Sequence, residues 1–162
     1  MLFSFLLLLS SISLANPNIN IESYEKFGTF RGTPIVLVCD DVPVSMSYIE
    51  KAFKVWKDKG ESYTKIVRES ENFICSQENN QQYRNVIQIT GYRGNFDTVQ
   101  YGGYTFWSRY KSNKELIGTK IELHPNLNTT TQDSFFNIVL HEIGHAYGYE
   151  HSDIVNDVMN IH

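Results

Sequence analysis

The strongest constraint on the fold is residues 141–151, which read HEIGHAYGYEH. His141 and His145 are four residues apart, so on a helix they project from the same face about one turn apart. A helix that continued past Gly148 would carry His151 away from them, whereas glycine can adopt a positive φ and turn the chain back. The pattern therefore predicts a helix that ends in a glycine turn, with three imidazoles converging on one point.

Three neutral imidazoles are typical of a catalytic zinc site, because three protein ligands leave the fourth tetrahedral position to water. We therefore predict one Zn²⁺ ion bound by His141, His145 and His151. Glu142 directly follows the first ligand, so its carboxylate is expected beside the metal, where it can act as a general base toward the bound water. The alternative is three histidines without a metal, which would need other polar partners if buried.

The pattern H-E-x-x-H-x-x-G-x-x-H resembles the metzincin zinc metalloproteases. His151-Ser152, followed by Met159 eight positions after His151, is similar to the matrixins, the branch of the matrix-metalloproteinase catalytic domain. The resemblance implies that Met159 lies in a tight turn beneath the metal without binding it. Residues 47–57 are similar to the first matrixin helix, so the resemblance covers most of residues 34–160.

Hydrophobic periodicity predicts five strands and two long helices. The first helix is expected to begin with a capping box of Ser47 and Glu50 and to end near Gly60. Thr130 and Asp133 form the same capping pattern before the second helix, which carries the histidines. The expected strands are residues 34–39, 63–67, 86–90, 104–110 and 118–123.

The predicted fold class is α+β, with an α/β-type twisted mixed sheet. The matrixin resemblance implies five strands with one antiparallel edge strand, and two long helices, of which the active-site helix ends in the glycine turn. Residues 104–110 are the candidate edge strand, because unpaired backbone groups there could bind an extended peptide and position its carbonyl at the metal. An edge strand without this role is the alternative.

Residues 1–15, MLFSFLLLLSSISLA, are uncharged and end in small residues, which predicts a signal peptide and a catalytic domain of residues 16–162. The apolar stretch is too short to span a bilayer, so we expect a secreted protein without a membrane span. An uncleaved anchor or a buried helix is the alternative. Cys39 and Cys75 both follow the cleavage point, which favours one disulfide over two free buried thiols.

The charge balance is acidic, with 14 Lys and Arg against 18 Asp and Glu and a net charge of −4. No basic stripe follows the chain, so we expect no nucleic-acid partner. Calcium is possible, but no D-x-D-x-D-G loop places it, and a solvated surface is the default for the acidic candidates. These candidates are Asp97, Asp133, Asp153 and Asp157.

Together, these features predict a secreted zinc metalloendopeptidase, a monomeric hydrolase that cleaves extended protein or peptide substrates with Glu142 as base. The main alternative is a catalytically inactive binding or host-interaction protein on the same fold. It is motivated by the chain's end at His162, without the helix that follows the methionine turn in matrixins. Zinc-dependent cleavage of a non-peptide amide is a third candidate.

Overall fold

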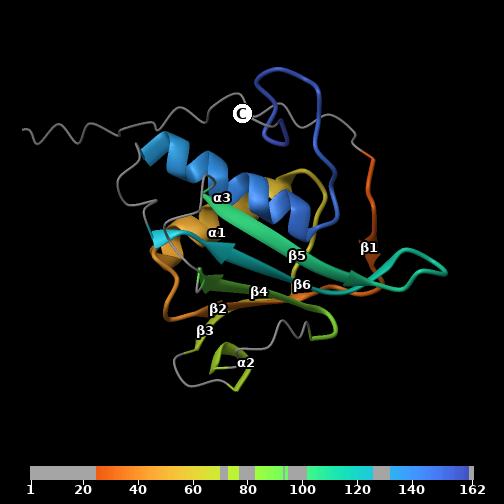
Figure 1. Cartoon of the computed structure of the whole chain (residues 1–162), viewed down its shortest axis with the longest axis horizontal. Helices are drawn as coiled ribbons and strands as arrows, with labels where there is room; N and C mark the ends of the chain where they lie inside the picture. The colour runs from red at the N-terminus through yellow and green to blue at the C-terminus, as the bar shows by residue number, and fades with distance from the viewer. Residues whose placement is uncertain are drawn as a thin grey trace, which may run out of the picture.

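The computed structural model describes residues 25–69, 73–76, 83–92, 94, 102–125 and 132–160. These residues form one six-stranded sheet, with two long helices on one face and a short helix on the other (Figure 1). In chain order the elements are β1 (Thr29–Phe30), β2 (Ile35–Cys39), α1 (Met46–Asp58), β3 (Ile66–Glu69), α2 (Phe73–Ser76), β4 (Val86–Gly91), β5 (Gly103–Arg109), β6 (Glu115–Leu123) and α3 (Gln132–Ala146).

The sheet is parallel except for β5. Among the parallel strands, β6 pairs with β1 and β4, β4 pairs with β2, and β2 pairs with β3, whereas β5 pairs antiparallel with β6. Leu116 of β6 pairs with both β1 and β5, and Ile121 of β6 pairs with both β4 and β5. A strand has two edges, so β1 and β4 share one edge of β6 and β5 occupies the other. The antiparallel strand therefore lies at the edge of the sheet.

The predicted fold class is wrong on two points. The sheet has six strands rather than five, because Thr29–Phe30 joins the start of β6 as a parallel strand. Two residues are too few to produce the alternation by which a strand is recognised in sequence. The class is α/β-like rather than α+β, because every strand pair other than β5 with β6 is parallel.

The predicted capping box of α1 is also wrong. The N-cap is Ser45, with extended backbone angles and no side-chain hydrogen bond to the first turn. The hydroxyl of Ser45 lies 3.0 Å from that of Ser47 instead. The helix begins at Met46, so Ser47 lies inside its first turn. No side-chain cap stabilises the first turn of α1. The helix is stabilised instead by the burial of its apolar face.

The main core lies between the two long helices and the sheet. Fully buried side chains from both helices and the sheet meet there: Ile49, Phe53 and Trp56 of α1, Val139 and Ile143 of α3, and Ile87, Ile89 and Ile121 of the sheet. The Trp56 indole Nε1 donates a hydrogen bond to the carbonyl of Leu140, 2.9 Å away. This bond and the apolar contacts fix α3, which carries the candidate site, against α1 and the sheet.

The opposite face of the sheet carries the predicted disulfide, which joins Cys39 at the end of β2 to Cys75 of α2. Both cysteines are buried and pack with Leu37. The prediction of one disulfide over two free thiols is confirmed, since the structure has no free cysteine. The bond attaches the short α2 to the sheet.

Replacing both cysteines with alanine is expected to lower the free energy of unfolding by about 4 kcal/mol, because the bond closes a loop of 36 residues in the unfolded chain. Urea unfolding of the parent and the Cys39→Ala, Cys75→Ala double variant measures the difference. The parent in excess reductant should lose the same stability. An unchanged unfolding midpoint in both cases would contradict this role for the disulfide.

Some predictions concern residues outside those described. They include the signal peptide at residues 1–15, the first residue of the Thr130 capping box, and Asp97. Within the described part of the chain, no helix has both the length and the apolar character needed to cross a membrane.

Candidate metal centre

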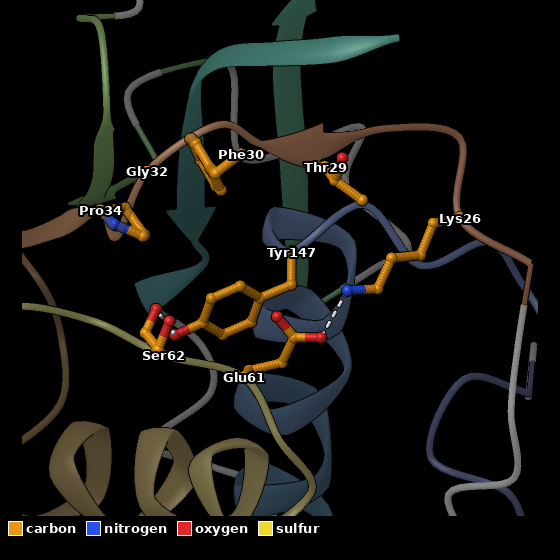
Figure 2. A pocket seen from close by; sticks show the side chains of 8 residues that line it. All are labelled: Lys26, Thr29, Phe30, Gly32, Pro34, Glu61, Ser62 and Tyr147. Carbon is orange, nitrogen blue, oxygen red and sulfur yellow. Dashed lines mark hydrogen bonds and ion pairs between the residues drawn. The ribbon is translucent and has the colours of Figure 1, made fainter.

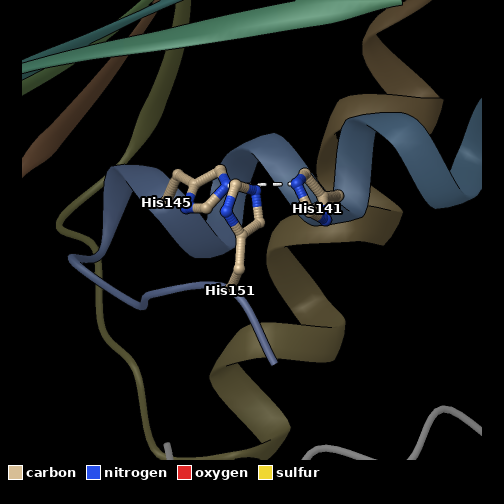
Figure 3. A group of neighbouring side chains, drawn as sticks. All are labelled: His141, His145 and His151. Atoms are coloured by element: carbon tan, nitrogen blue, oxygen red, sulfur yellow. Dashed lines mark hydrogen bonds between the residues drawn. The ribbon is translucent and has the colours of Figure 1, made fainter. Parts of the chain in front are cut away.

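The three predicted ligands lie together at the C-terminal end of α3 (Figure 3). His141 and His145 project from the same side of the helix, about one turn apart. The helix ends at Ala146, and the chain turns at Gly148, where φ is +91°, so that His151 comes back toward the helix. The Nε2 atom of His145 lies 3.0 Å from Nε2 of His141 and 3.1 Å from Nε2 of His151. The glycine turn therefore brings all three imidazoles to one point.

The turn is held from outside by the N-terminal segment, which we define as residues 25–28. The backbone amide of Phe27 donates to the carbonyl of Gly148 at 2.9 Å, and the amide of Glu150 donates to the carbonyl of Glu25 at 3.2 Å. These two bonds flank an antiparallel bridge between the segment and the turn. The residue just before the third histidine is therefore fixed by main-chain hydrogen bonds.

Two backbone carbonyls orient the first two imidazoles. Nδ1 of His141 lies 2.7 Å from the carbonyl oxygen of Val158, and Nδ1 of His145 lies 2.8 Å from that of Tyr149. A carbonyl oxygen only accepts hydrogen bonds, so each Nδ1 carries a proton and donates it. In the neutral rings the lone pair is therefore on Nε2, the atom that faces the other histidines.

This arrangement fits a metal ion. The lone pairs of two neutral imidazoles 3.0 Å apart repel each other unless a cation lies between them. A tetrahedral zinc with Zn–N bonds of about 2.0–2.1 Å holds its nitrogen ligands about 3.4 Å apart, which is close to the spacing here. Among the described residues, this is the one group of three or more His, Cys, Asp or Glu that could hold an ion.

Burial and, to a smaller extent, the neighbouring His141 lower the pKa of His145 to about 4. The hydrogen bond to the Tyr149 carbonyl acts the other way. At neutral pH His145 is therefore uncharged, which is the state in which an imidazole binds a metal ion.

A tight turn beyond the third histidine contains Met159, whose side chain is fully buried. The Asp157 carboxylate accepts a hydrogen bond from the amide of Met159 at 2.7 Å, and the Met159 carbonyl accepts one from the amide of Ser152 at 2.9 Å. This turn presents the Val158 carbonyl to His141. Asp157, expected on a solvated surface, is instead buried, because its carboxylate caps the turn.

Glu142 lies on α3 directly after the first histidine, and its side chain is turned toward β5. The Oγ1 hydroxyl of Thr105 lies 2.6 Å from the Glu142 Oε2 atom and donates to it. Only 7% of Glu142 is exposed, and this burial raises the pKa of its carboxyl to about 7, although the bond from Thr105 lowers it. Such a carboxylate exchanges protons readily near neutral pH.

A separate polar cavity of about 190 Å³ lies between the N-terminal segment, β1 and the chain after α1 (Figure 2). Lys26 forms an ion pair with Glu61 there, and the Tyr147 hydroxyl donates to the carbonyl of Ser62 at 3.4 Å. Glu61 also accepts a hydrogen bond from the hydroxyl of Tyr149 at 2.6 Å. Because these polar groups are paired with one another, we assign the cavity a structural role in holding the N-terminal segment.

Sequence reasoning missed the side-chain and backbone partners of the site. Thr105 was expected only as part of an edge strand, and the carbonyls of Tyr149 and Val158 were not considered. Every residue has a carbonyl, so no residue type marks the last two. Calcium gains no support, since the one cluster of three or more candidate side-chain ligands among the described residues is the set of three histidines.

No protein-family model matches the chain, and no curated protein sequence matches it. Among solved structures, the chain is similar to archaemetzincin from Archaeoglobus fulgidus, which was crystallised in complex with malonate. The TM-score is 0.43 and the identity 16%, over 80% of this chain and 86% of that chain. The matrixin resemblance stays a prediction.

Proposed function

We propose that the protein is a zinc-dependent peptidase with His141, His145 and His151 as metal ligands. One observation carries this proposal. The Nε2 atoms of His141 and His145 lie 3.0 Å apart with their lone pairs facing each other, while the Nδ1 atom of each ring donates a hydrogen bond to a backbone carbonyl. Without a cation between them, two lone pairs this close repel each other, so the arrangement is unfavourable unless a metal ion is bound. The third imidazole completes a set of three protein ligands, which is the number found in catalytic zinc sites.

Zinc bound by three imidazoles supplies a water with a pKa of about 7 and polarises a substrate carbonyl. We assign Glu142 the role of general base. Its Oε2 atom is bonded to Thr105, so Oε1 is the atom that takes the proton of the attacking water. The same carboxyl then returns the proton to the leaving amine.

We propose an extended peptide as the substrate, bound along β5. Of the strands described, only β6 pairs with β5, so the other edge of β5 could hydrogen-bond a peptide main chain. Thr105 and Trp107 lie on the same face of this strand, and Thr105 contacts Glu142. A peptide on this edge would therefore pass close to the general base.

We also propose that the protein is exported. The disulfide between Cys39 and Cys75 supports this location, because such bonds persist in oxidising compartments and are rare in the cytosol. The uncharged apolar residues 2–9 are the expected targeting signal. Detection of the processed protein in the culture medium of expressing cells would test the proposal.

The purified protein is expected to bind about one zinc ion per chain and to cleave unlabelled proteins, with cleavage stopped by a chelator and restored by zinc. Elemental analysis measures the metal, and mass spectrometry of a protein mixture identifies each backbone bond that is cut. If the protein binds zinc but cleaves no backbone bond, the result would favour the alternative of a catalytically inactive binding protein. A folded protein that takes up no zinc would overturn the proposed function.

A further inference from the structure

We infer that Thr105 is a positioning residue, whose hydroxyl holds the carboxylate of Glu142 in its working orientation. The inference deepens the proposed function and rests on it, since the role of Glu142 as base is part of that proposal. It stands on the contacts between β5 and α3, two elements that run beside each other in Figure 1.

The hydrogen bond from Thr105 is short and charge-assisted. Its Oγ1 atom lies 2.6 Å from Oε2 of Glu142 and 3.0 Å from the backbone carbonyl oxygen of the same residue. A hydroxyl has a single proton, and an ionised carboxylate is the stronger acceptor, so the proton is donated to Oε2. If the carboxyl takes up a proton on Oε1, Oε2 remains an acceptor and keeps the hydrogen bond from Thr105. Thr105 can therefore bond Glu142 in either charge state.

A second residue of β5 confines the same side chain. A Cβ atom on Gly103 would lie 2.8 Å from Cγ and 3.2 Å from Cδ of Glu142, so only glycine leaves room for the carboxylate. Gly103 and Thr105 are two apart and therefore lie on the same face of the strand. The absent side chain of one and the hydroxyl of the other together fix where Glu142 lies.

Both residues are on a well-anchored part of the sheet. Gly103 pairs with Leu123 and Thr105 pairs with Ile121, and both of these β6 residues are buried in the core. The β-branched side chain of Thr105 also restricts its χ1 angle, which limits the directions its hydroxyl can take. A serine could make the same bond with less restriction, whereas valine could not make it at all.

The direct test observes the Glu142 carboxyl by NMR in protein labelled with ¹³C at the glutamate carboxyl carbons. The resonance is assigned by its absence in Glu142→Gln. We expect Thr105→Val to shift it, in both zinc-free and zinc-loaded protein, and Thr105→Ser to leave it close to the parent position. An unshifted resonance in Thr105→Val would overturn the inference without reference to peptide cleavage.

The matched control is Thr119→Val, which removes a hydroxyl from the neighbouring strand. Thr119 is buried in β6, and its Oγ1 has no hydrogen-bond partner among the described residues. The two variants make the same chemical change in the same sheet. Thr119→Val is expected to leave the Glu142 resonance unshifted. If both variants shift it equally, the cause is general repacking of the sheet and the inference is wrong.

Peptide cleavage provides the second readout. Thr105→Val is expected to lower kcat about 10- to 100-fold with KM and zinc content unchanged, because the base is present but misplaced. Thr105→Ser should recover kcat to within about threefold of the parent. Equal losses in both Thr105 variants would show that the methyl group, rather than the hydroxyl, matters, and would contradict the inference.

The two proposals fail in different ways. If the parent cleaves no peptide, or cleaves as fast as Glu142→Gln, the proposed function fails, while the NMR comparison still decides whether Thr105 positions Glu142. If the parent is active and Thr105→Val retains both the parent kcat and the parent resonance, only the positioning role fails.

Discussion

Replacing Glu142 with glutamine is expected to lower kcat/KM for peptide cleavage by about 10²- to 10⁴-fold while leaving the zinc content unchanged. Glutamine has nearly the same shape and keeps an oxygen that can accept the hydrogen bond from Thr105. Its amide cannot take up a proton near neutral pH, so the attacking water loses its base. Steady-state kinetics and elemental analysis of the same preparation measure both quantities.

The matched control is Glu150→Gln, which makes the same charge change on an exposed side chain next to the third histidine. Its kcat/KM is expected to stay within about twofold of the parent, as for most surface substitutions. If both variants lose the same factor in kcat/KM, the effect comes from the charge near the site and not from the loss of a base. If Glu142→Gln cleaves as fast as the parent, the role assigned to Glu142 is wrong.

The convergence of the three histidines could be predicted from the sequence because the spacing and the glycine that allow it are local features. The spacing of His141 and His145 places them on one helix face, and Gly148 is the residue that lets the chain turn. Both features lie within residues 141–151 and can be read from the sequence, whereas the hydrogen bonds from residues 25–28 that hold the turn cannot.

The partners of these residues could not be predicted, because they come from distant parts of the chain. Thr105 precedes Glu142 by 37 residues, and only the pairing of β5 with β6 and the packing of α3 bring them together. The carbonyls of Tyr149 and Val158 carry no side-chain signal. These contacts depend on how distant elements pack together, and the hydrophobic periodicity of the sequence does not predict that packing.

The errors in the fold have similar causes. The strand predicted at residues 63–67 is observed as β3 at Ile66–Glu69, because pairing with β2 rather than local apolar content sets its limits. The two-residue β1 depends on its contact with β6. Strong local patterns gave the long helices, whereas short strands are defined by their neighbours.

The N-terminal segment connects the metal centre with the rest of the fold. The Phe27 ring packs on Trp107 of β5, with 4.5 Å between ring centroids, and the Phe27 carbonyl accepts a hydrogen bond from Arg109. Lys26 is paired with Glu61, which also binds the hydroxyl of Tyr149. The segment therefore ties the turn before the third histidine to β5 on one side and to the chain after α1 on the other.

Replacing Gly148 with alanine is expected to break this connection. A Cβ atom there would lie 2.1 Å from the carbonyl oxygen of Gly28, and φ is +91°, which a side chain disfavours. Backbone strain of about 1–2 kcal/mol and overpacking of about 1–3 kcal/mol together predict a loss of about 3 kcal/mol in stability. Displacement of His151 should also weaken zinc binding at least about 10-fold. Urea unfolding and competition with a chelator measure the two effects.

Gly60→Ala separates the two contributions. Gly60 also has a positive φ, of +105°, but a Cβ atom there would meet nothing within 4 Å. This variant should lose only the strain, about 1 kcal/mol, and should bind zinc as the parent does. If Gly148→Ala costs no more than Gly60→Ala and retains the parent affinity for zinc, the N-terminal segment does not hold the turn. A larger loss of stability with unchanged zinc affinity would instead mean that His151 is positioned independently of that contact.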